Sequence, residues 1–507
     1  MRKTLTLTLS LALAVPVAVA QIGIGPIHNS VPSANPRVGT PDTVISTGFQ
    51  LKTIAVGTDA LENPSAKITQ FGLLADGTRT EPDQNLYLVL DHVQGPTPGY
   101  NYGHHFLFQG HENAGDMAYV TRINLDVTDP AHRITLLTPE GADGFTHFNS
   151  VDGSTYDPIS KTLFFTEEVG AAGGAFQVSL TWPPVITTLD GILGKAGYEG
   201  IHPDDRGNLL IIEDTGGTGV NVNPQDPASP KTAKQPNSFV YRFLPNDPKD
   251  ITKGGKLQAL QVSIHGDPVV FNATDPVGDT FSTNQLLLHT PGTSYPVGWV
   301  TVHDTDVNGL DSFDANAAAK IAGATPFKRP ENGQFLPGSD YRTFYFCPTG
   351  DTDATAGTVP DLAARGSWGS IFRVDLRRNR NSGTISIFVL GDAAHASFDN
   401  LTFADFNTLL ATEDRGDLLH GQLNTLDSVW AFPVRGHHAA KRFVALGRDA
   451  TSVAGGEDNE PTGLHVSNGS RFLFAQPGSP LNLLFARGFL TRQHGDNVVW
   501  EIVKTRD

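Results

Sequence analysis

The sequence KTLFFTEEVGAAGG (residues 161–174) begins with a run typical of a β-strand and ends in two carboxylates followed by glycines. The same pattern recurs in GNLLIIEDTGG (residues 207–217) and in FNTLLATEDRGD (residues 406–417). Each run is followed by a second strand-like segment that contains an aromatic residue: AFQVSL, SFVYRFLP or SVWAFPV. The pattern therefore indicates a repeated unit of short antiparallel strands.

The spacing of the acidic strand ends indicates the size of this unit. Glu167 and Glu213 are 46 positions apart, and Glu413 and Glu460 are 47 apart. A repeat of about 45 to 50 residues is typical of one four-stranded blade of a β-propeller. The chain has 53 Gly and 34 Pro, spread along its length, as many short strands and turns require. We expect an all-β propeller of six blades, or alternatively seven, with inserted loops and one short helix in residues 311–323.

The two ends of the sequence predict how the chain is organised. Residues 1–20 carry Arg2 and Lys3, an apolar run and a small-residue site, which predicts a secretory signal cleaved after Ala20. Residues 21–45 are expected to form a flexible segment, and residues 46–507 a single propeller domain. No later apolar run has the length of a membrane span. We therefore expect a secreted or periplasmic protein, and a monomer.

Composition excludes some functions. The formal net charge of −17 disfavours binding to nucleic acid, which requires a basic surface. Cys347 is the single cysteine, so no internal disulfide is possible. The sequence has neither a G-x-S-x-G nucleophile motif nor a phosphate-binding glycine loop.

The acidic strand ends predict a metal site. In a propeller the inner strands converge on one axis, so acids far apart in sequence would meet there. Several carboxylates in one place raise each other's pKa unless cations neutralise them. Calcium takes six to eight oxygen ligands and fits such a cluster. The alternative is that each acid is a solvated turn residue or caps backbone N–H groups.

Four longer stretches together resemble a known family. They are GYEGIHPDDRGNLLIIED, AGATPFKRPENGQF, SFDNLTFADFNTLLATEDRGD and EDNEPTGLHVSNGSRFLFAQPGSP. In order and spacing they resemble the PhoX-type bacterial alkaline phosphatases, over about residues 103–480. The resemblance implies a six-bladed propeller whose axial metals hydrolyse small phosphate esters.

The resemblance also implies site residues. Arg329 is expected to contact the phosphate, which suits its planar fork of donors, and Asn149 is expected to lie at the catalytic site. The expected metal ligands are Glu167, Glu168, Glu199, Glu213, Asp214, Glu331, Glu413 and Glu460.

One position departs from the family pattern. The family's iron-binding cysteine follows an asparagine, whereas THFNSVDG keeps Asn149 and has Ser150 in place of the thiol. A serine oxygen is a poorer ligand than a thiolate for iron. The expected cofactor is therefore calcium, and iron or another transition metal stays open. Two alternatives to the phosphatase remain: a non-catalytic, calcium-stabilised binding scaffold, and a calcium-dependent lactonase-type hydrolase.

Overall fold

The computed structural model describes residue 27 and residues 43–414, 419–423, 425–436, 439–446, 460–467, 487–493 and 496–505. This part of the chain is mostly β, as the sequence predicted, but it has seven short helices where the sequence predicted one. The expected signal peptide and most of the segment 21–45 lie outside the described residues. No described helix has the length and apolar character needed to cross a bilayer.

Most strands belong to five antiparallel sheets. The first contains β3 (Glu81–Val89), β4 (His105–Glu112), β5 (Tyr119–Asn124) and β6 (Ile134–Leu136). The second contains β7 (Val151–Asp157), β8 (Thr162–Glu167), β9 (Gly174–Ser179) and β10 (Ile186–Thr188). A third, larger sheet runs in the order β11 (Tyr198–Pro203), β12 (Leu209–Glu213), β15 (Val240–Pro245), β16 (Gly255–Ile264), β18 (Tyr295–Asp304), β22 (Ser382–Leu390), β21 (Ser370–Leu376), β20 (Thr343–Pro348) and β19 (Pro330–Phe335), with β17 (Asp267–Pro268) paired to β16.

The other two sheets join the beginning of the described chain to its end. One has the order β1 (Thr43–Ile45), β26 (Lys441–Leu446), β25 (Ser428–Pro433), β24 (Thr408–Glu413) and β23 (Phe398–Asp405). The other has the order β2 (Phe49–Ala55), β29 (Val498–Lys504), β28 (Arg487–Gln493) and β27 (Glu460–Ser467). Early strands thus complete sheets built from late ones, which ties the two ends of the fold together by backbone hydrogen bonds. A separate hairpin pairs β13 (Gly219–Val220) with β14 (Ala233–Lys234).

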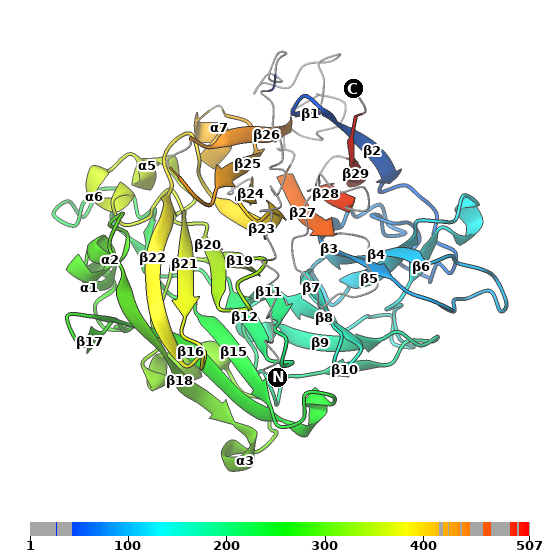
Figure 1. The fold of residues 1–507 in the computed structure, drawn as a ribbon, viewed down its shortest axis with the longest axis horizontal. Coiled ribbons are helices and arrows are strands. Elements are labelled where there is room, and N and C mark those ends of the chain that lie inside the picture. Colours follow the sequence, from blue (N-terminus) through cyan, green and yellow to red (C-terminus); the bar gives the residue numbers. More distant parts are fainter. Residues whose placement is uncertain are drawn as a thin grey trace, which may run out of the picture.

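Six strands form a closed ring at the centre of the molecule (Figure 1). In the described chain, β3 lies beside β7, β7 beside β11, β11 beside β19, β19 beside β23, β23 beside β27, and β27 beside β3. The remaining strands extend outward from this ring. Apolar side chains fill the space between neighbouring sheets: Phe108 of β4 and Phe165 of β8 share one core cluster, and Phe164 and Ile211 share the next.

The helices lie outside the ring. They are α1 (Pro276–Thr280), α2 (Thr283–Leu288), α3 (Thr305–Asn308), α4 (Ala315–Ala322), α5 (Ala354–Gly357), α6 (Pro360–Ala363) and α7 (Leu419–Leu423), with 3-10 turns at Pro130–His132, Gly170–Ala172 and Ile251–Lys253. The helix expected within residues 311–323 is α4. The Asp314 carboxylate caps its first turn by accepting from the Ala317 N–H, and Gly323 ends it in the left-handed region at φ 75°.

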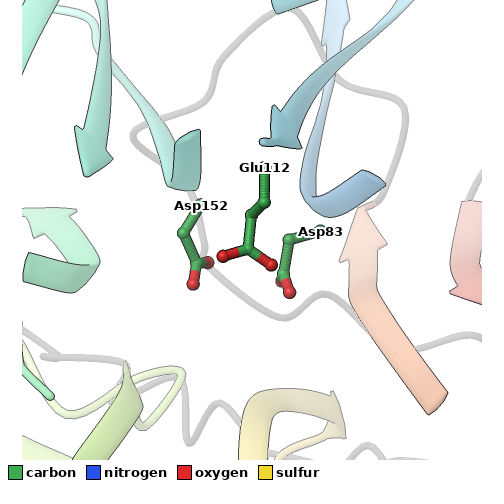
Figure 2. A group of neighbouring side chains, drawn as sticks. All are labelled: Asp83, Glu112 and Asp152. Carbon is green, nitrogen blue, oxygen red and sulfur yellow. The ribbon is translucent and has the colours of Figure 1, made fainter. Parts of the chain in front are cut away.

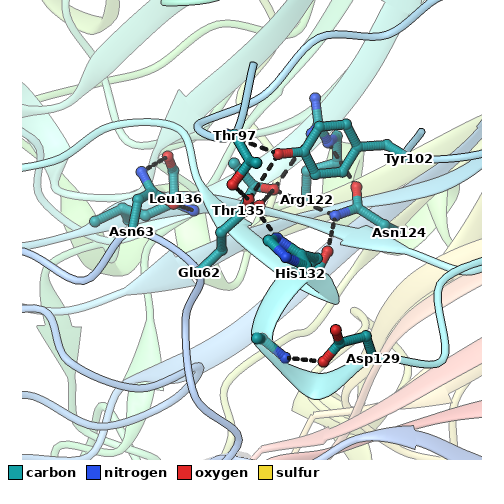
Figure 3. A network of polar contacts seen from close by, with 11 residues as sticks. Glu62, Asn63, Thr97, Tyr102, Arg122, Asn124, Asp129, His132, Thr135 and Leu136 are labelled. Carbon is teal, nitrogen blue, oxygen red and sulfur yellow. Dashed lines mark hydrogen bonds and ion pairs between the residues drawn. The ribbon is translucent and has the colours of Figure 1, made fainter. Parts of the chain in front are cut away.

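A buried carboxylate fixes the segment before β3 to the first sheet. Glu62 accepts hydrogen bonds from Thr97 and Tyr102, at 2.8 and 2.6 Å, and is paired with His132 at 2.7 Å (Figure 3). The guanidinium of Arg122 lies over the Tyr102 ring. These contacts hold together loops that are far apart in the sequence, so the network has a structural role.

Candidate metal centre

An acidic cavity of about 320 Å³ opens at the first residues of the ring strands. Its lining residues are Glu81, Asp83, Glu112, Asp152, Glu168, Glu199, Arg329, Glu331, Asp399, Asp414, Glu460 and Gln493. Ten of them carry a carboxyl group and one carries a positive charge. The acids come from all six ring strands, from the last residue of β4 (Glu112), and from the residues just after β8 and β24 (Glu168 and Asp414).

A β-bulge near the acid interrupts the pairing of every ring strand. The register shifts between Pro82 and Asn85, Val151 and Ser154, Tyr198 and Ile201, Pro330 and Gly333, Phe398 and Leu401, and Thr462 and His465. A bulge adds a residue to one strand, increases its twist and redirects the side chains beside it. In five strands the acid lies inside this interval, and in β27 Glu460 lies two positions before it. In these five strands, therefore, the bulge accompanies an acid that faces the centre.

Three acid pairs lie at the ends of β8, β12 and β24, the strands that pair with ring strands β7, β11 and β23. The two members of each pair lie in different environments. Glu168 and Asp414 line the cavity, and Asp214 binds the cavity residue Arg329. The preceding acids, Glu167 and its counterparts in the other pairs, are not among the lining residues. Successive residues of an extended chain point to opposite sides, so only one member of each pair can face the centre.

Two groups of three carboxylates have ligand atoms close enough to share one cation. Oxygens of Asp83, Glu112 and Asp152 all lie within 4.8 Å of one another, and Figure 2 shows these side chains converging from three strands. Oxygens of Glu168, Asp214 and Glu331 meet the same criterion. The Gln493 amide donates to Glu112 at 3.2 Å and also to Asp83, which holds the first group in place.

The burial of so many acids raises their pKa values. Burial, followed by the neighbouring acids, raises the pKa of Asp152, Glu168 and Glu199 well above the usual carboxyl range. Burial raises the pKa of Asp83 to about 6 and that of Glu331 to about 8. Without bound cations, like charges at these separations oppose full ionisation of the cluster.

The donor set fits hard cations. The Oε2 atom of Glu199 and the Oδ1 atom of Asp152 are buried without a hydrogen-bond partner in the described chain, which is costly unless another ligand binds them. The lining supplies carboxylate oxygens and one amide, as calcium prefers, and it contains neither thiol nor imidazole. The residues present therefore fit calcium better than a metal that requires sulfur or nitrogen ligands.

Arg329 supplies the positive charge in the cavity. Its Nε and Nη2 atoms lie 2.9 and 2.8 Å from Oδ2 of Asp214, and Nη2 is 3.8 Å from Oε1 of Glu331. Burial opposes its charge, but these two carboxylates raise the pKa of Arg329 above its ordinary value. The guanidinium is thus held charged at the wall of the cavity.

Three expected ligands instead bind protein groups away from the cavity. Glu167 accepts from the backbone N–H of Asn149 at 2.9 Å. Glu213 accepts from the Tyr241 hydroxyl at 2.8 Å, and Glu413 accepts from a backbone N–H at 3.1 Å. The structure brings the other five, Glu168, Glu199, Asp214, Glu331 and Glu460, together at the cavity or beside it.

Asn149 is also absent from the cavity lining. Its side chain binds Asp116, accepting from the backbone N–H at 2.9 Å and donating to the carboxylate at 2.5 Å. The Cys347 thiol is fully buried against the carbonyl oxygens of Asn332 and Asp399, and burial raises its pKa well above normal. Cys347 therefore does not replace the iron-binding cysteine that the family has at the position of Ser150.

Six lining acids were not among the expected ligands: Glu81, Asp83, Glu112, Asp152, Asp399 and Asp414. A pattern at the ring strands could have found three of them. Asp83, Asp152 and Asp399 precede Gln84, Gly153 and Asn400, just as Glu199 and Glu331 precede Gly200 and Asn332, so an acid followed by glycine or an amide recurs five times at a strand start.

The fold and the site together define a mostly β protein with a carboxylate-lined centre suited to hard cations. The sequence profile of Alkaline phosphatase PhoX matches residues 218–474, about half of the chain. The chain belongs to this family.

Solved structures resemble the chain only distantly, and no curated protein matches its sequence. YCF48 bound to D1 peptide is 9% identical, with a TM-score of 0.29 over 93% of this chain and 100% of that chain. A putative 6-phosphogluconolactonase from Bacteroides uniformis is 10% identical, with a TM-score of 0.32 over 83% and 100%. Saccharomyces cerevisiae Sqt1 is 10% identical, with a TM-score of 0.31 over 88% and 100%.

Proposed function

We propose that the protein is a metal-dependent phosphoesterase that hydrolyses small phosphate esters in the acidic cavity. The observation that carries the proposal is the position of Arg329 among ten carboxyl groups, which places an anion-binding group beside candidate cation ligands. Membership of the PhoX family supports the same activity. The closed ring of six strands supports a six-bladed β-propeller with the cavity on its axis.

The chain's own residues have three tasks in this proposal. Glu168, Asp214 and Glu331 hold one cation, and Asp83, Glu112 and Asp152 hold another. Arg329 binds phosphate oxygens through charge-assisted hydrogen bonds and is oriented by Asp214. Bound calcium would neutralise charge on the phosphate and lower the pKa of a coordinated water.

The other residues expected to bind metal have two different roles in this proposal. Glu199 and Glu460 line the cavity and would complete the calcium ligands. Glu167, Glu213 and Glu413 would support the site from behind, by fixing the backbone or neighbouring side chains. Asn149 would also act at a distance, through Asp116 and Glu167.

A non-catalytic calcium scaffold is the second candidate. It is favoured by the contact of Asp214 with two nitrogens of Arg329, which occupies much of the phosphate-binding fork, and by Ser150 in place of a metal-binding thiol. In the proposed setting, residues 46–507 are one secreted or periplasmic domain that follows a signal peptide cleaved after Ala20, and the protein acts as a monomer.

One experiment separates the phosphoesterase from the scaffold and from the third alternative, a calcium-dependent lactonase-type hydrolase. The mature protein is freed of metal and reloaded with calcium, or with calcium and iron, and its metal content is measured. A chromogenic phosphomonoester, a phosphodiester and a lactone are then offered to each form. Calcium-dependent turnover of a phosphate ester supports the phosphoesterase. Tight calcium binding without turnover under any metal supports the scaffold, and turnover of the lactone alone supports the lactonase.

A further inference from the structure

A second cavity lies beyond the bulges of the same ring strands. Its volume is about 110 Å³, and its lining includes residues 84–86, 154–156 and 463–466, each farther along its strand than the acid that faces the first cavity. Tyr156, Pro158 and Pro203 are half-buried, so this cavity reaches the surface. The ring therefore carries two chemically different cavities along its length.

The second cavity offers no free charge. Neither lysine nor arginine is among its described lining residues, and its single acid is Asp204. The Asp204 carboxylate accepts from the backbone N–H groups of Arg206 and Asn208 at 2.8 and 3.0 Å, and from Nη1 of Arg380 at 2.8 Å. Because this carboxylate is neutralised by its own contacts, a phosphate dianion or a free cation finds no counter-charge here.

Four buried polar atoms in this cavity have no hydrogen-bond partner in the described chain. They are Nε2 of Gln84, Oδ1 of Asn85, Oγ of Ser154 and Nε2 of His465. The first three residues are only 6, 5 and 7% exposed. Gln84 presents a donor, Asn85 an acceptor, and the Ser154 hydroxyl can act as either. Unpartnered buried groups of this kind are costly unless a ligand or water binds them.

The two histidines of the cavity stay neutral. Burial lowers the pKa of both His202 and His465 to about 4. His202 shares a hydrogen bond of 2.9 Å with Oδ1 of Asn332, which can only accept, so His202 donates from Nε2. The polar part of the lining is thus made of amides, hydroxyls and neutral imidazoles.

Apolar side chains complete the lining. Leu86, Leu401, Leu464 and Val466 lie beside the polar groups, together with the Tyr156 ring. A cavity of about 110 Å³ exceeds the space that a single water needs, so it can admit a small molecule. A molecule that fits must present C–H groups to the apolar side chains and hydrogen-bond donors and acceptors to the polar ones.

We propose that this second cavity binds a small, neutral polyhydroxylated molecule, of the size of a three- to five-carbon polyol or sugar. Hydroxyl groups both donate and accept, so they can satisfy Gln84, Asn85 and Ser154 together. The carbon chain of such a ligand packs against Leu401 and Leu464. The site is separate from the acidic cavity and does not depend on phosphoesterase activity.

The test is a calorimetric titration of the full-length mature protein, loaded with calcium, with glycerol, erythritol, ribose and xylitol. 1,4-Butanediol, which has the carbon chain of erythritol and half of its hydroxyls, is the ligand control. The double variant Gln84→Met/Ser154→Ala removes two unpartnered groups and keeps the side-chain volume nearly constant. Ser370→Ala is the matched control, because Ser370 is also a buried serine without a partner in the described chain but does not line the cavity.

At least one polyol is expected to bind, more tightly than 1,4-butanediol. The double variant should weaken this binding by about tenfold or more, the order expected for loss of two buried hydrogen bonds, whereas Ser370→Ala should leave it unchanged. Thermal melting checks that both variants fold. The proposal is wrong if no polyol binds at high millimolar concentration and a crystal structure shows only water in the cavity. It is equally wrong if zinc binds in place of polyols and His465→Leu abolishes that binding.

Discussion

Arg329 lies side-on against Asp214, with its Nε and Nη2 atoms 2.9 and 2.8 Å from the same carboxylate oxygen. Asp214 comes from the end of the β12 region and Arg329 from the residue before β19, 115 positions later. The pairing orients a planar cation at the cavity wall, which a lysine cannot reproduce because its ammonium is a point charge.

Arg329→Lys is therefore expected to lower kcat/KM for a phosphate ester by about 100-fold, the order found when one oriented charge donor is lost. Steady-state kinetics on the calcium-loaded protein measures the effect. Arg373→Lys is the control, because Arg373 is paired with Asp375 at 2.8 Å on the half-exposed face of β21. Equal kcat/KM values for Arg329→Lys and the unmodified protein would contradict a role of this guanidinium in phosphate binding.

The pair Glu167 and Glu168 tests which member of an acid pair binds the metal. Glu168→Gln removes a charged ligand from the group with Asp214 and Glu331, and should weaken calcium binding by about tenfold or more. Glu167→Gln keeps an oxygen that accepts from the Asn149 N–H, so calcium affinity should change little. Equilibrium dialysis with both variants measures this difference, and a larger loss in Glu167→Gln would reverse the assignment.

The acid cluster predicts a pH-dependent effect of calcium on stability. Burial raises the pKa of Asp83 to about 6 and that of Glu331 to about 8 in the folded state, above the usual carboxyl values of about 4. At a pH between the carboxyl pKa values of the unfolded and folded states, the folded protein binds more protons than the unfolded chain. Raising the pH through this window therefore lowers the free energy of unfolding of the metal-free protein. Calcium binds the ionised carboxylates and relieves their repulsion.

The rise in Tm on adding calcium should therefore be larger at pH 8 than at pH 5. Differential scanning calorimetry with and without a chelator measures it at both pH values. The buried histidines affect the calcium-bound and the calcium-free protein alike. Their contribution therefore cancels in the difference between the two Tm values at each pH. A shift that is larger at pH 5 would show that the cluster does not hold the cation.

Gly153 is predicted to be irreplaceable next to the ring acid Asp152. A Cβ atom at this position would lie 1.7 Å from the backbone oxygen of Glu199, on the neighbouring ring strand. Gly153→Ala should therefore separate β7 from β11 and destabilise the protein by about 2 kcal/mol or more. Chemical denaturation measures the loss. Gly216→Ala, where a Cβ atom meets nothing within 4 Å, is the control and should change stability by much less.

The sequence predicted the repeated strands better than it predicted which acidic side chains line the central cavity. The strand runs at residues 161–168 and 207–214 appear as β8 and β12, and the helix expected in residues 311–323 is α4. In both strands, however, the sequence of the acid pair does not show which of the two carboxylates faces the cavity. A shift of one residue in the strand register would exchange the two. Glu168 and Asp214 are at or beside the cavity, while Glu167 and Glu213 bind protein groups.

Local pattern by itself determined that this chain is mostly β, acidic and built from a repeated unit, because strand propensity, turn residues and charge are properties of neighbouring residues. A sequence pattern can mark acids such as these as candidates, but which of them share one cavity was decided by the tertiary structure. Asp83, Asp152 and Asp399 come from strands far apart in the chain, and the closed ring and its bulges bring their carboxylates to one cavity. Contacts of this kind depend on how sheets pack and where a bulge shifts the register, and no single segment of sequence encodes them.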